Sequence, residues 1–215
     1  MYVPEHFAVE DADALIARLA RRFAGVLASV DGEGQPVATH MPILWDAAAR
    51  TARGHVARAN PQWRFGAGRA LLVLAGPEAY ISPSFYPSKA EHGKVVPTWN
   101  YEAVHMSGEI EWFEDAARLE ALVRDLSALH ERDQPAPWSI EDAPRAYIEA
   151  MLRGIVGVEM RVDKIEAKRK LSQNKSAADH RGVVDGLERA DDSGSREIAA
   201  LMRATRAVAD DPDGN

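Results

Sequence analysis

The hydrophobic and polar positions of the chain predict short strands flanked by amphipathic helices. Residues 11–23 repeat apolar side chains at helical spacing. An apolar run at 25–30 is followed by the turn sequence Asp-Gly-Glu-Gly at 31–34, and residues 37–45 then alternate as a strand does. This pattern predicts a hairpin whose second strand is interrupted by Pro42, at an edge or a bulge of its sheet.

The rest of the chain continues this mixture of strands and helices. Further strands are predicted at residues 51–58, 71–74, 98–114 and 155–165, with 77–82 as a continuation of the second beyond a bulge. Further helices are predicted at 118–130, 144–152, 176–189 and from 193 toward the C-terminus. The proline-containing stretch 83–97 predicts a long ordered loop, and a basic turn is predicted from Lys168. Short strands joined by turns and flanked by helices indicate an α+β fold, a small antiparallel β-barrel with helical additions.

Composition narrows the classes of protein to be considered. The 215 residues are 46% hydrophobic and 27% charged, which supplies a packed core. A formal net charge of −7 argues against a surface that embraces nucleic acid as a whole, while a local basic patch stays open. The absence of cysteine excludes disulfides, thiolate metal sites and thiol catalysis. No signal-peptide pattern and no long apolar run is present, so we expect a soluble cytoplasmic protein without a membrane partner.

The sequence lacks the common motifs of nucleotide-binding and hydrolytic enzymes. It contains no phosphate-binding loop, no dinucleotide-binding glycine motif after a strand, no nucleophile elbow and no zinc-protease motif. The seven histidines show no pairing at helical spacing, and we expect no metal site.

Four segments carry polar side chains where a barrel would otherwise be apolar. They are residues 39–42, 55–62, 97–101 and 168–175. The last combines four cations with three amide or hydroxyl side chains, the groups that bind a phosphate monoester, and so indicates an anion site. The alternative is ordinary turn composition, which in the last segment leads into a helix capped by Ser176.

Taken together, these segments resemble those of a known protein family. The matching blocks are Met1–Phe7, Thr39–Pro42, Gly54–Trp63, Tyr86–Lys89, Val95–His105 and Lys170–Lys175. They resemble the PaiB family, the FMN-binding negative transcriptional regulators with a flavin-binding split barrel. The resemblance implies a six-stranded antiparallel split β-barrel with flanking helices. We expect one domain over residues 1–190, followed by a C-terminal helix and polar tail over 191–215.

The resemblance also implies a homodimer with FMN in a groove at the subunit interface. Leu72, Val73 and Trp99 are expected near the surface that the two copies share. The expected FMN contacts fall into four groups: Arg58, Asn60 and Gln62 at the phosphate and ribityl chain, with His55 beside them; His40 and Met41 near the ring; Thr98, Trp99 and Asn100 along the groove; and Lys170, Ser172, Gln173 and Asn174 from the same or the opposite subunit.

Three functions stay open from the sequence. The first is the family's role, an FMN-binding transcriptional regulator, and the second is an FMN-dependent NAD(P)H oxidoreductase similar to a flavin reductase. The third, haem handling, lacks a convincing axial histidine. DNA is a weakly supported partner, because no helix-turn-helix with a basic recognition helix is found. The basic cluster at 164–175 is also the best anion site for the cofactor.

Overall fold

A computed structural model describes residues 1–210, and the last part of the predicted tail, residues 211–215, lies outside the described residues. The chain forms two compact units, each built from separate segments. Unit 1 comprises residues 1–10, 76–103 and the chain from 167 onward, and unit 2 comprises residues 11–75 and 104–166. The prediction of one domain over residues 1–190 stays a prediction.

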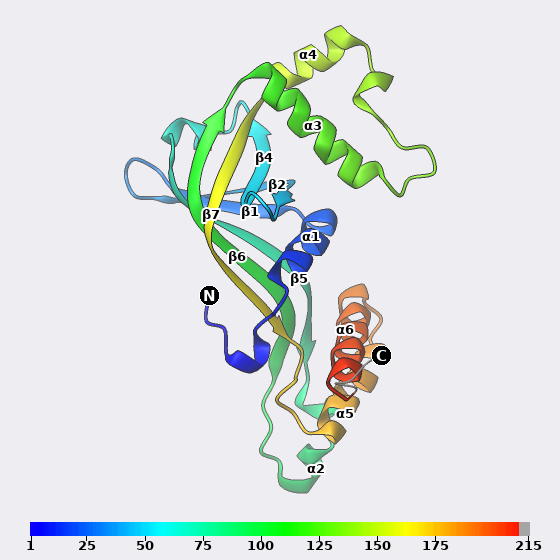
Figure 1. The fold of residues 1–215 in the computed structure, drawn as a ribbon. Helices are drawn as coiled ribbons and strands as arrows, with labels where there is room; N and C mark the ends of the chain where they lie inside the picture. Colours follow the sequence, from blue (N-terminus) through cyan, green and yellow to red (C-terminus); the bar gives the residue numbers. More distant parts are fainter. Residues whose placement is uncertain (211–215) are drawn as a thin grey trace. The chain divides into compact units, whose positions relative to one another are not determined.

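The described strands form one antiparallel sheet that does not close, as predicted for a split barrel of the α+β class (Figure 1). Its order is β2-β1-β5-β6-β7-β4-β3. The strands are β1 (Gly25–Val30), β2 (Pro36–Met41), β3 (Leu44–Asp46), β4 (Thr51–Ala57), β5 (Gly68–Ile81), β6 (Thr98–Phe113) and β7 (Ile155–Lys170). The three longest, β5, β6 and β7, each contribute residues to both units.

Pro42 explains why the described sheet has seven strands and not the predicted six. The predicted second strand is broken after Met41 and resumes at Leu44, so that β2 and β3 lie at opposite ends of the sheet order. Proline cannot donate a ladder hydrogen bond, and the chain leaves one edge of the sheet here and joins the other. Gly54 permits this path, because a Cβ there would lie 2.6 Å from the carbonyl oxygen of Pro42.

Six α-helices are described, and all but α2 were predicted, with small shifts of their ends. They are α1 (Ala12–Arg22), α2 (Ser88–His92), α3 (Ala116–Glu131), α4 (Arg145–Arg153), α5 (Ala177–Glu188) and α6 (Ser193–Asp210). The side chains of Asp11 and Ser176 cap α1 and α5, as N-cap residues do. Two predictions need correction: the loop at 83–97 contains the short helix α2, and the basic turn begins after Lys170 because β7 continues to that residue.

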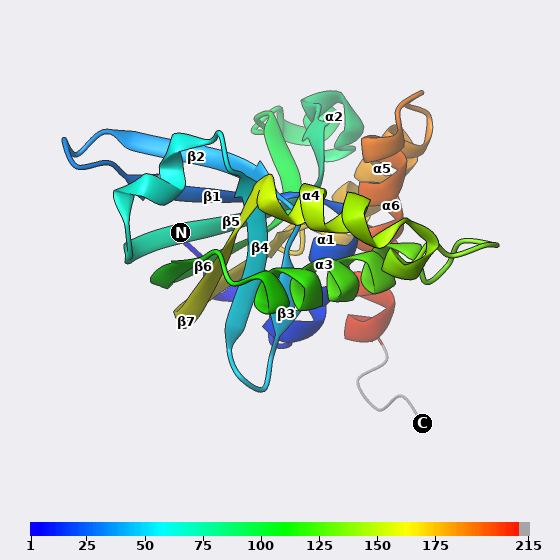
Figure 2. The ribbon, with the colours of Figure 1, turned by 90° about the horizontal axis from the view of Figure 1, so that it is seen from above.

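In unit 2, α3 and α4 cover the outer side of part of the sheet (Figure 2). Phe113, Leu122, Ile148 and other buried residues form the cluster between them, and Leu44 of β3 packs against it. Gly157 makes room for Phe113, since a Cβ at Gly157 would lie 2.3 Å from the ring. The residues of β4 that alternate outward therefore face this helical layer.

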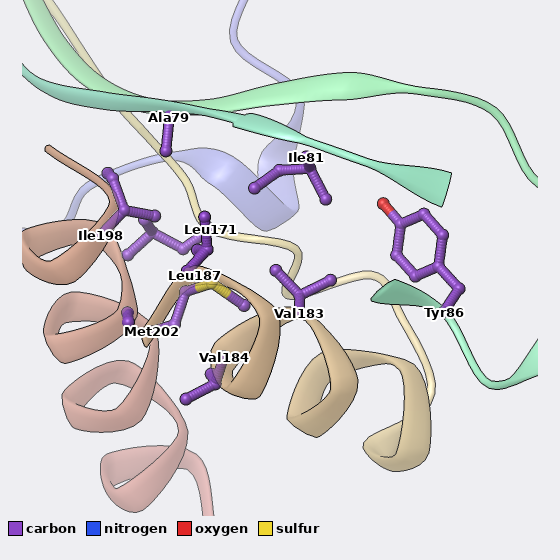
Figure 3. Packing of buried hydrophobic residues seen from close by; sticks show 10 residues of the cluster. Ala79, Ile81, Tyr86, Leu171, Val183, Val184, Leu187, Ile198 and Met202 are labelled. Atoms are coloured by element: carbon purple, nitrogen blue, oxygen red, sulfur yellow. The ribbon is translucent and has the colours of Figure 1, made fainter. Parts of the chain in front are cut away.

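Unit 1 has a core of its own beneath α5 and α6 (Figure 3). Ile81 of β5, Leu171, Val183 and Leu187 of α5, and Met202 of α6 are buried there together. The predicted C-terminal helix is thus packed into a core over its described part, and it is not merely an extension of the chain.

Candidate functional site

Asn60 and Gln62, two predicted flavin contacts, belong to a hydrogen-bond network inside unit 2. Asn60 Nδ2 donates to Thr39 Oγ1 at 2.8 Å, and Asn60 Oδ1 accepts from the backbone N–H of Gln62. Gln62 is 1% exposed, and its Nε2 donates to Leu27 O at 3.1 Å and to Ser29 Oγ at 3.0 Å. The two amides thus join the short 3-10 helix Pro61–Phe65 to β1 and β2.

His40 and Met41 point to opposite faces of β2, because neighbouring strand residues alternate. Met41 is buried in the core, and His40 is exposed. His40 pairs in register with Val26 of β1, which in turn pairs with Val73 of β5. Of the two, only His40 therefore lies on the outward face of this part of the sheet.

This outward face of unit 2 is apolar and partly exposed. We define it by Val26, Ala28, Leu71 and Val73, which stand side by side on β1 and β5. A hollow of about 410 Å³ opens on it, lined in part by Ala28, Leu71 and Ser107. Leu72 was expected near such a surface and is instead 1% exposed, because its neighbours Leu71 and Val73 are the residues that point outward.

His55 lies on the side of β4 that faces the α3–α4 layer. It alternates with Arg53, whose Nη2 lies 3.5 Å from Asp125 Oδ2 of α3, and it pairs in register with Gly157 beside Phe113. Burial lowers the pKa of the His55 imidazole, because it disfavours the charged form. Its buried Nδ1 has no hydrogen-bond partner among the residues described. Sequence reasoning could not have placed His55 on this face.

Arg58 is already held by partners within unit 2. Its Nε donates to Arg153 O at 2.6 Å, its Nη2 donates to Ile155 O at 3.2 Å, and its guanidinium pairs with the carboxylate of Glu114. These contacts join the end of β4 to the ends of α4 and β6. Its predicted role in phosphate binding stays a prediction.

The loop that follows β7 in unit 1 owes its shape to three of the predicted site residues. Asn100 is completely buried, and its Nδ2 donates to Ser172 Oγ at 3.0 Å. Gln173 folds back on its own loop, where Nε2 donates to Arg169 O at 2.6 Å and Oε1 accepts from Leu171 N at 2.7 Å. Ser172 has a φ of 61°, in the left-handed region, and these hydrogen bonds stabilise that conformation.

The cations around this loop have different partners. Arg169 Nε donates to the buried Glu102 carboxylate at 2.7 Å. Lys168 is buried, donates to Tyr2 O at 3.1 Å, and lies over the ring of Tyr101 at 5.3 Å. Lys175 lies 5.2 Å from the centroid of the Tyr86 ring. Of these three, only Arg169 is paired with a carboxylate.

Lys170 likewise has no carboxylate partner among the described residues. Its ammonium contacts only neutral groups, Thr98 Oγ1 and Trp99 O. Partial burial lowers the pKa of Lys170, and the like charges of Lys168 and Lys175 lower it further. An anion beside Lys170 would stabilise its charged form against both burial and the repulsion of the neighbouring lysines. This position therefore suits a negatively charged ligand.

Two large aromatic side chains accompany Lys170 on the surface of unit 1. Tyr80 and Trp99 are each 50% exposed and form an edge-to-face pair with ring centroids 6.0 Å apart. We call Thr98, Trp99, Lys170 and Tyr80 the aromatic-cation patch. The patch offers a ring surface and an ammonium, the two groups that a planar, phosphate-bearing ligand such as FMN requires.

Thr98, Trp99 and Lys170 of this patch were predicted from the sequence as FMN contacts, and Tyr80 was not included. Asn174, the remaining predicted contact, is exposed on the loop. Tyr80 was missed because it stands in a strand whose pattern carries no special signal. The partners of Lys168, Tyr2 and Phe7, lie in the opening segment, whose match to the family was the available hint.

Comparison with known proteins identifies the family. Residues 1–164 match the family model described as "Putative FMN-binding domain". The chain is 35% identical to the Bacillus subtilis protein named protease synthase and sporulation protein PAI 2, over 94% of this chain and 96% of that protein. The chain belongs to the PaiB family of FMN-binding domains. An uncharacterised Aspergillus fumigatus protein is also 35% identical, over 65% of this chain and 66% of its own length.

Solved structures confirm the split-barrel fold. A conserved hypothetical protein of Mycobacterium tuberculosis, Rv2991, is 15% identical with a TM-score of 0.54, over 85% of this chain and 92% of that one. The flavocytochrome Anf3 of Azotobacter vinelandii is 12% identical with a TM-score of 0.53, over 79% of this chain and 72% of its own. Family membership makes FMN the cofactor of this PaiB-family chain, and the aromatic-cation patch fits it.

Residues 1–210 show no helical membrane span and no cluster of metal ligands. No helix there combines the length and the hydrophobicity that a membrane crossing requires. In the same range, no three histidine, aspartate or glutamate side chains are grouped so that they could hold a metal ion.

Proposed function

We propose that this protein is a dimeric FMN-binding regulator of the PaiB type, which holds FMN at the aromatic-cation patch, at the interface of the two subunits. The observation that carries the proposal is Lys170, a partly buried ammonium without a carboxylate partner, beside two half-exposed aromatic rings. Without a ligand, the Lys170 ammonium has no negatively charged partner and the two rings stay exposed to water. An anionic, aromatic ligand would pair with the ammonium and cover the rings. When bound, FMN supplies the redox chemistry of its ring.

The predicted contacts in unit 1 divide into two roles. Thr98, Trp99 and Lys170 are proposed to touch FMN, because their side chains remain accessible around the patch. Asn100, Ser172 and Gln173 are proposed as positioning residues, since their polar atoms are used to hold the loop after β7. Lys170 is partly buried against this loop, and its reduced contact with water strengthens its attraction for a phosphate.

The homodimer is proposed to form through the outward apolar face of unit 2. Val26, Ala28, Leu71 and Val73 leave apolar surface in contact with water, and a second copy related by twofold symmetry would bury it. The exposed halves of Tyr80 and Trp99 are further aromatic surface, in unit 1, that a ligand or a second copy would shield from water.

The regulatory role is supported by the Bacillus subtilis relative, whose name refers to protease synthesis and sporulation. Direct DNA binding through the predicted basic cluster is weakly supported, because some of its cations are paired with carboxylates. Arg169 pairs with Glu102, Lys164 lies 3.0 Å from Glu166, and on α6 Arg203 pairs with Glu188. Of the five cations in the cluster at 164–175, Lys164 and Arg169 are thus paired with carboxylates. Lys170 is proposed to meet FMN, which leaves the buried Lys168 and Lys175 for DNA phosphates.

The test is a titration of the full chain with FMN, followed by quenching of flavin and tryptophan fluorescence. We expect saturable binding that weakens about ten- to a hundredfold in Lys170→Gln, because a charge-assisted contact is lost. Trp99→Leu should weaken binding and reduce the quenching. The matched control is Lys94→Gln, an exposed lysine of the same unit, which should bind FMN as the wild type does.

The same samples separate the remaining alternatives. Equal FMN affinity in Lys170→Gln and the wild type would refute the patch as the binding site. Sedimentation that returns only the 23.6 kDa monomer would refute the dimer. NADH or NADPH oxidation that exceeds the rate of free FMN would favour the oxidoreductase function over the regulator. A specific, strongly salt-dependent complex with the protein's own promoter would restore direct DNA binding.

A further inference from the structure

A cavity of about 380 Å³ lies in unit 2 between the first turn of α3 and the length of α4 from Arg145 to Arg153. It shares no lining residue with the hollow on the outward apolar face. Its volume is within the range of small-molecule binding sites. The cavity is lined by Arg58, Glu114, Ala116, Leu119, Arg145, Glu149, Leu152 and Arg153.

Two of the three arginines in this lining are neutralised by carboxylates. Arg58 is fixed by Glu114 and by backbone carbonyls, so its guanidinium cannot swing away from the cavity without losing these contacts. Arg145 Nε donates to Glu149 Oε1 at 2.9 Å along α4. The lining therefore contains two compensated pairs of opposite charge.

Arg153, at the end of α4, is the third arginine and has no such compensation. Among residues 1–210 its guanidinium makes no ion pair and no hydrogen bond, and its backbone carbonyl accepts from Arg58 Nε. The three arginines and two carboxylates of the lining sum to one positive charge, while Glu120, which accepts from Arg145 Nη1 at 2.7 Å, is not part of the lining. A planar guanidinium binds a carboxylate through two parallel hydrogen bonds, a geometry that lysine cannot offer.

The floor of the cavity is apolar. Leu119 of α3 and Leu152 of α4 are 2% and 6% exposed, and Ala116 adds a small side chain at the start of α3. We propose that this cavity binds a small organic monoanion, a carboxylate on an apolar aliphatic or aromatic body, with Arg153 as its charged contact. The carboxylate of the ligand would pair with Arg153, and its apolar body would pack against Leu119 and Leu152. The lining of this cavity shares no residue with the aromatic-cation patch.

The experiment is isothermal titration calorimetry of the full, FMN-loaded chain with benzoate and with hexanoate. Benzylamine serves as the matched cation, and inorganic phosphate as the matched anion without an apolar body. We expect saturable binding of at least one carboxylate, and no comparable binding of benzylamine or phosphate. Arg153→Gln should weaken carboxylate binding about ten- to a hundredfold. Arg132→Gln, at an exposed arginine beyond the cavity, should leave it unchanged.

A second variant tests the volume of the cavity apart from its charge. Ala116→Phe places a ring in the cavity from an exposed helix position, so the fold should persist and carboxylate binding should be lost. The absence of binding by both carboxylates in the wild type would overturn the proposal, as would unchanged binding in Arg153→Gln. A loss of FMN affinity in Arg153→Gln would also overturn it, by assigning the cavity to the flavin phosphate.

Discussion

Unit 1 and unit 2 each contain a network of uncharged polar side chains near a cation that the sequence marks for the cofactor. In unit 1, Asn100 and Ser172 are buried together, and Lys170 beside them has no carboxylate partner. In unit 2, Asn60 and Thr39 are joined in the same manner, yet Arg58 is paired with Glu114. Both networks shape the backbone, and only the first is accompanied by uncompensated charge.

The difference shows how similar compositions divide into structural and binding roles. Amides and hydroxyls in both units are engaged with the protein, because a buried polar group without a partner is costly. The capacity to attract an anion then depends on whether the neighbouring cation has already been neutralised. By this criterion unit 1 suits FMN, and the outward face of unit 2 suits an apolar partner.

The largest effect is expected where unit 1 depends most on its network. Asn100→Ala removes a completely buried amide, leaves Ser172 without its partner and opens a cavity. We expect the free energy of unfolding to fall by about 3 kcal/mol, measured by urea denaturation. Asn174→Ala, at an exposed position of the same loop, should change it by less than about 0.5 kcal/mol. Equal effects of the two variants would contradict the structural role of Asn100.

A smaller effect is expected from the cation of unit 2. Arg58→Ala removes hydrogen bonds to two carbonyls and the pair with Glu114, and should lower the free energy of unfolding by about 2 kcal/mol. Arg132→Ala is the matched control. An FMN titration of the folded variant then decides the predicted phosphate role: unchanged affinity would confine Arg58 to structure, and a tenfold loss would assign it to the site.

The smallest effect concerns pH and the imidazole of His55. Its pKa in the folded protein is lowered by burial, so between that value and the ordinary value near 6.5 only the unfolded chain takes up the proton. Acidification from about pH 7.5 to about pH 5.5 should therefore destabilise the wild type more than His55→Gln. His40→Gln, at an exposed histidine of unit 2, should follow the wild type. A wild type and a His55→Gln variant with parallel stability profiles would show that His55 titrates freely.

Much of the fold was predictable because it follows local rules. The alternation at 37–45 and the position of Pro42 predicted an interrupted strand, and the structure confirms the interruption as the gap between β2 and β3. Ser176 marked a helix start that the structure confirms. The extension of β7 to Lys170 was missed, because a run of cations resembles a turn when its strand partners are unknown.

The roles within the site could not be predicted from the sequence, because they depend on contacts between distant positions. Lys170 meets Thr98 and Trp99 across more than seventy residues, and Arg169 meets Glu102. No local pattern distinguishes the cation that acquires a carboxylate from the one that does not. The family resemblance supplied the correct cofactor, and the residues that contact it stay a prediction.

The division of each unit among separate stretches of chain has a consequence for the order of folding during synthesis. The segments of unit 2 have all been made once residue 166 has left the ribosome, whereas unit 1 still lacks the lysine-bearing end of β7 and the helices α5 and α6. A nascent chain proceeds from its N-terminus, so unit 2 can complete its contacts first. Until α5 and α6 have been made, Ile81 and the other β5 residues that pack against these helices stay exposed to solvent. The interval before the last fifty residues emerge is therefore the period in which the chain is most exposed to aggregation, and in which the aromatic-cation patch still lacks Lys170.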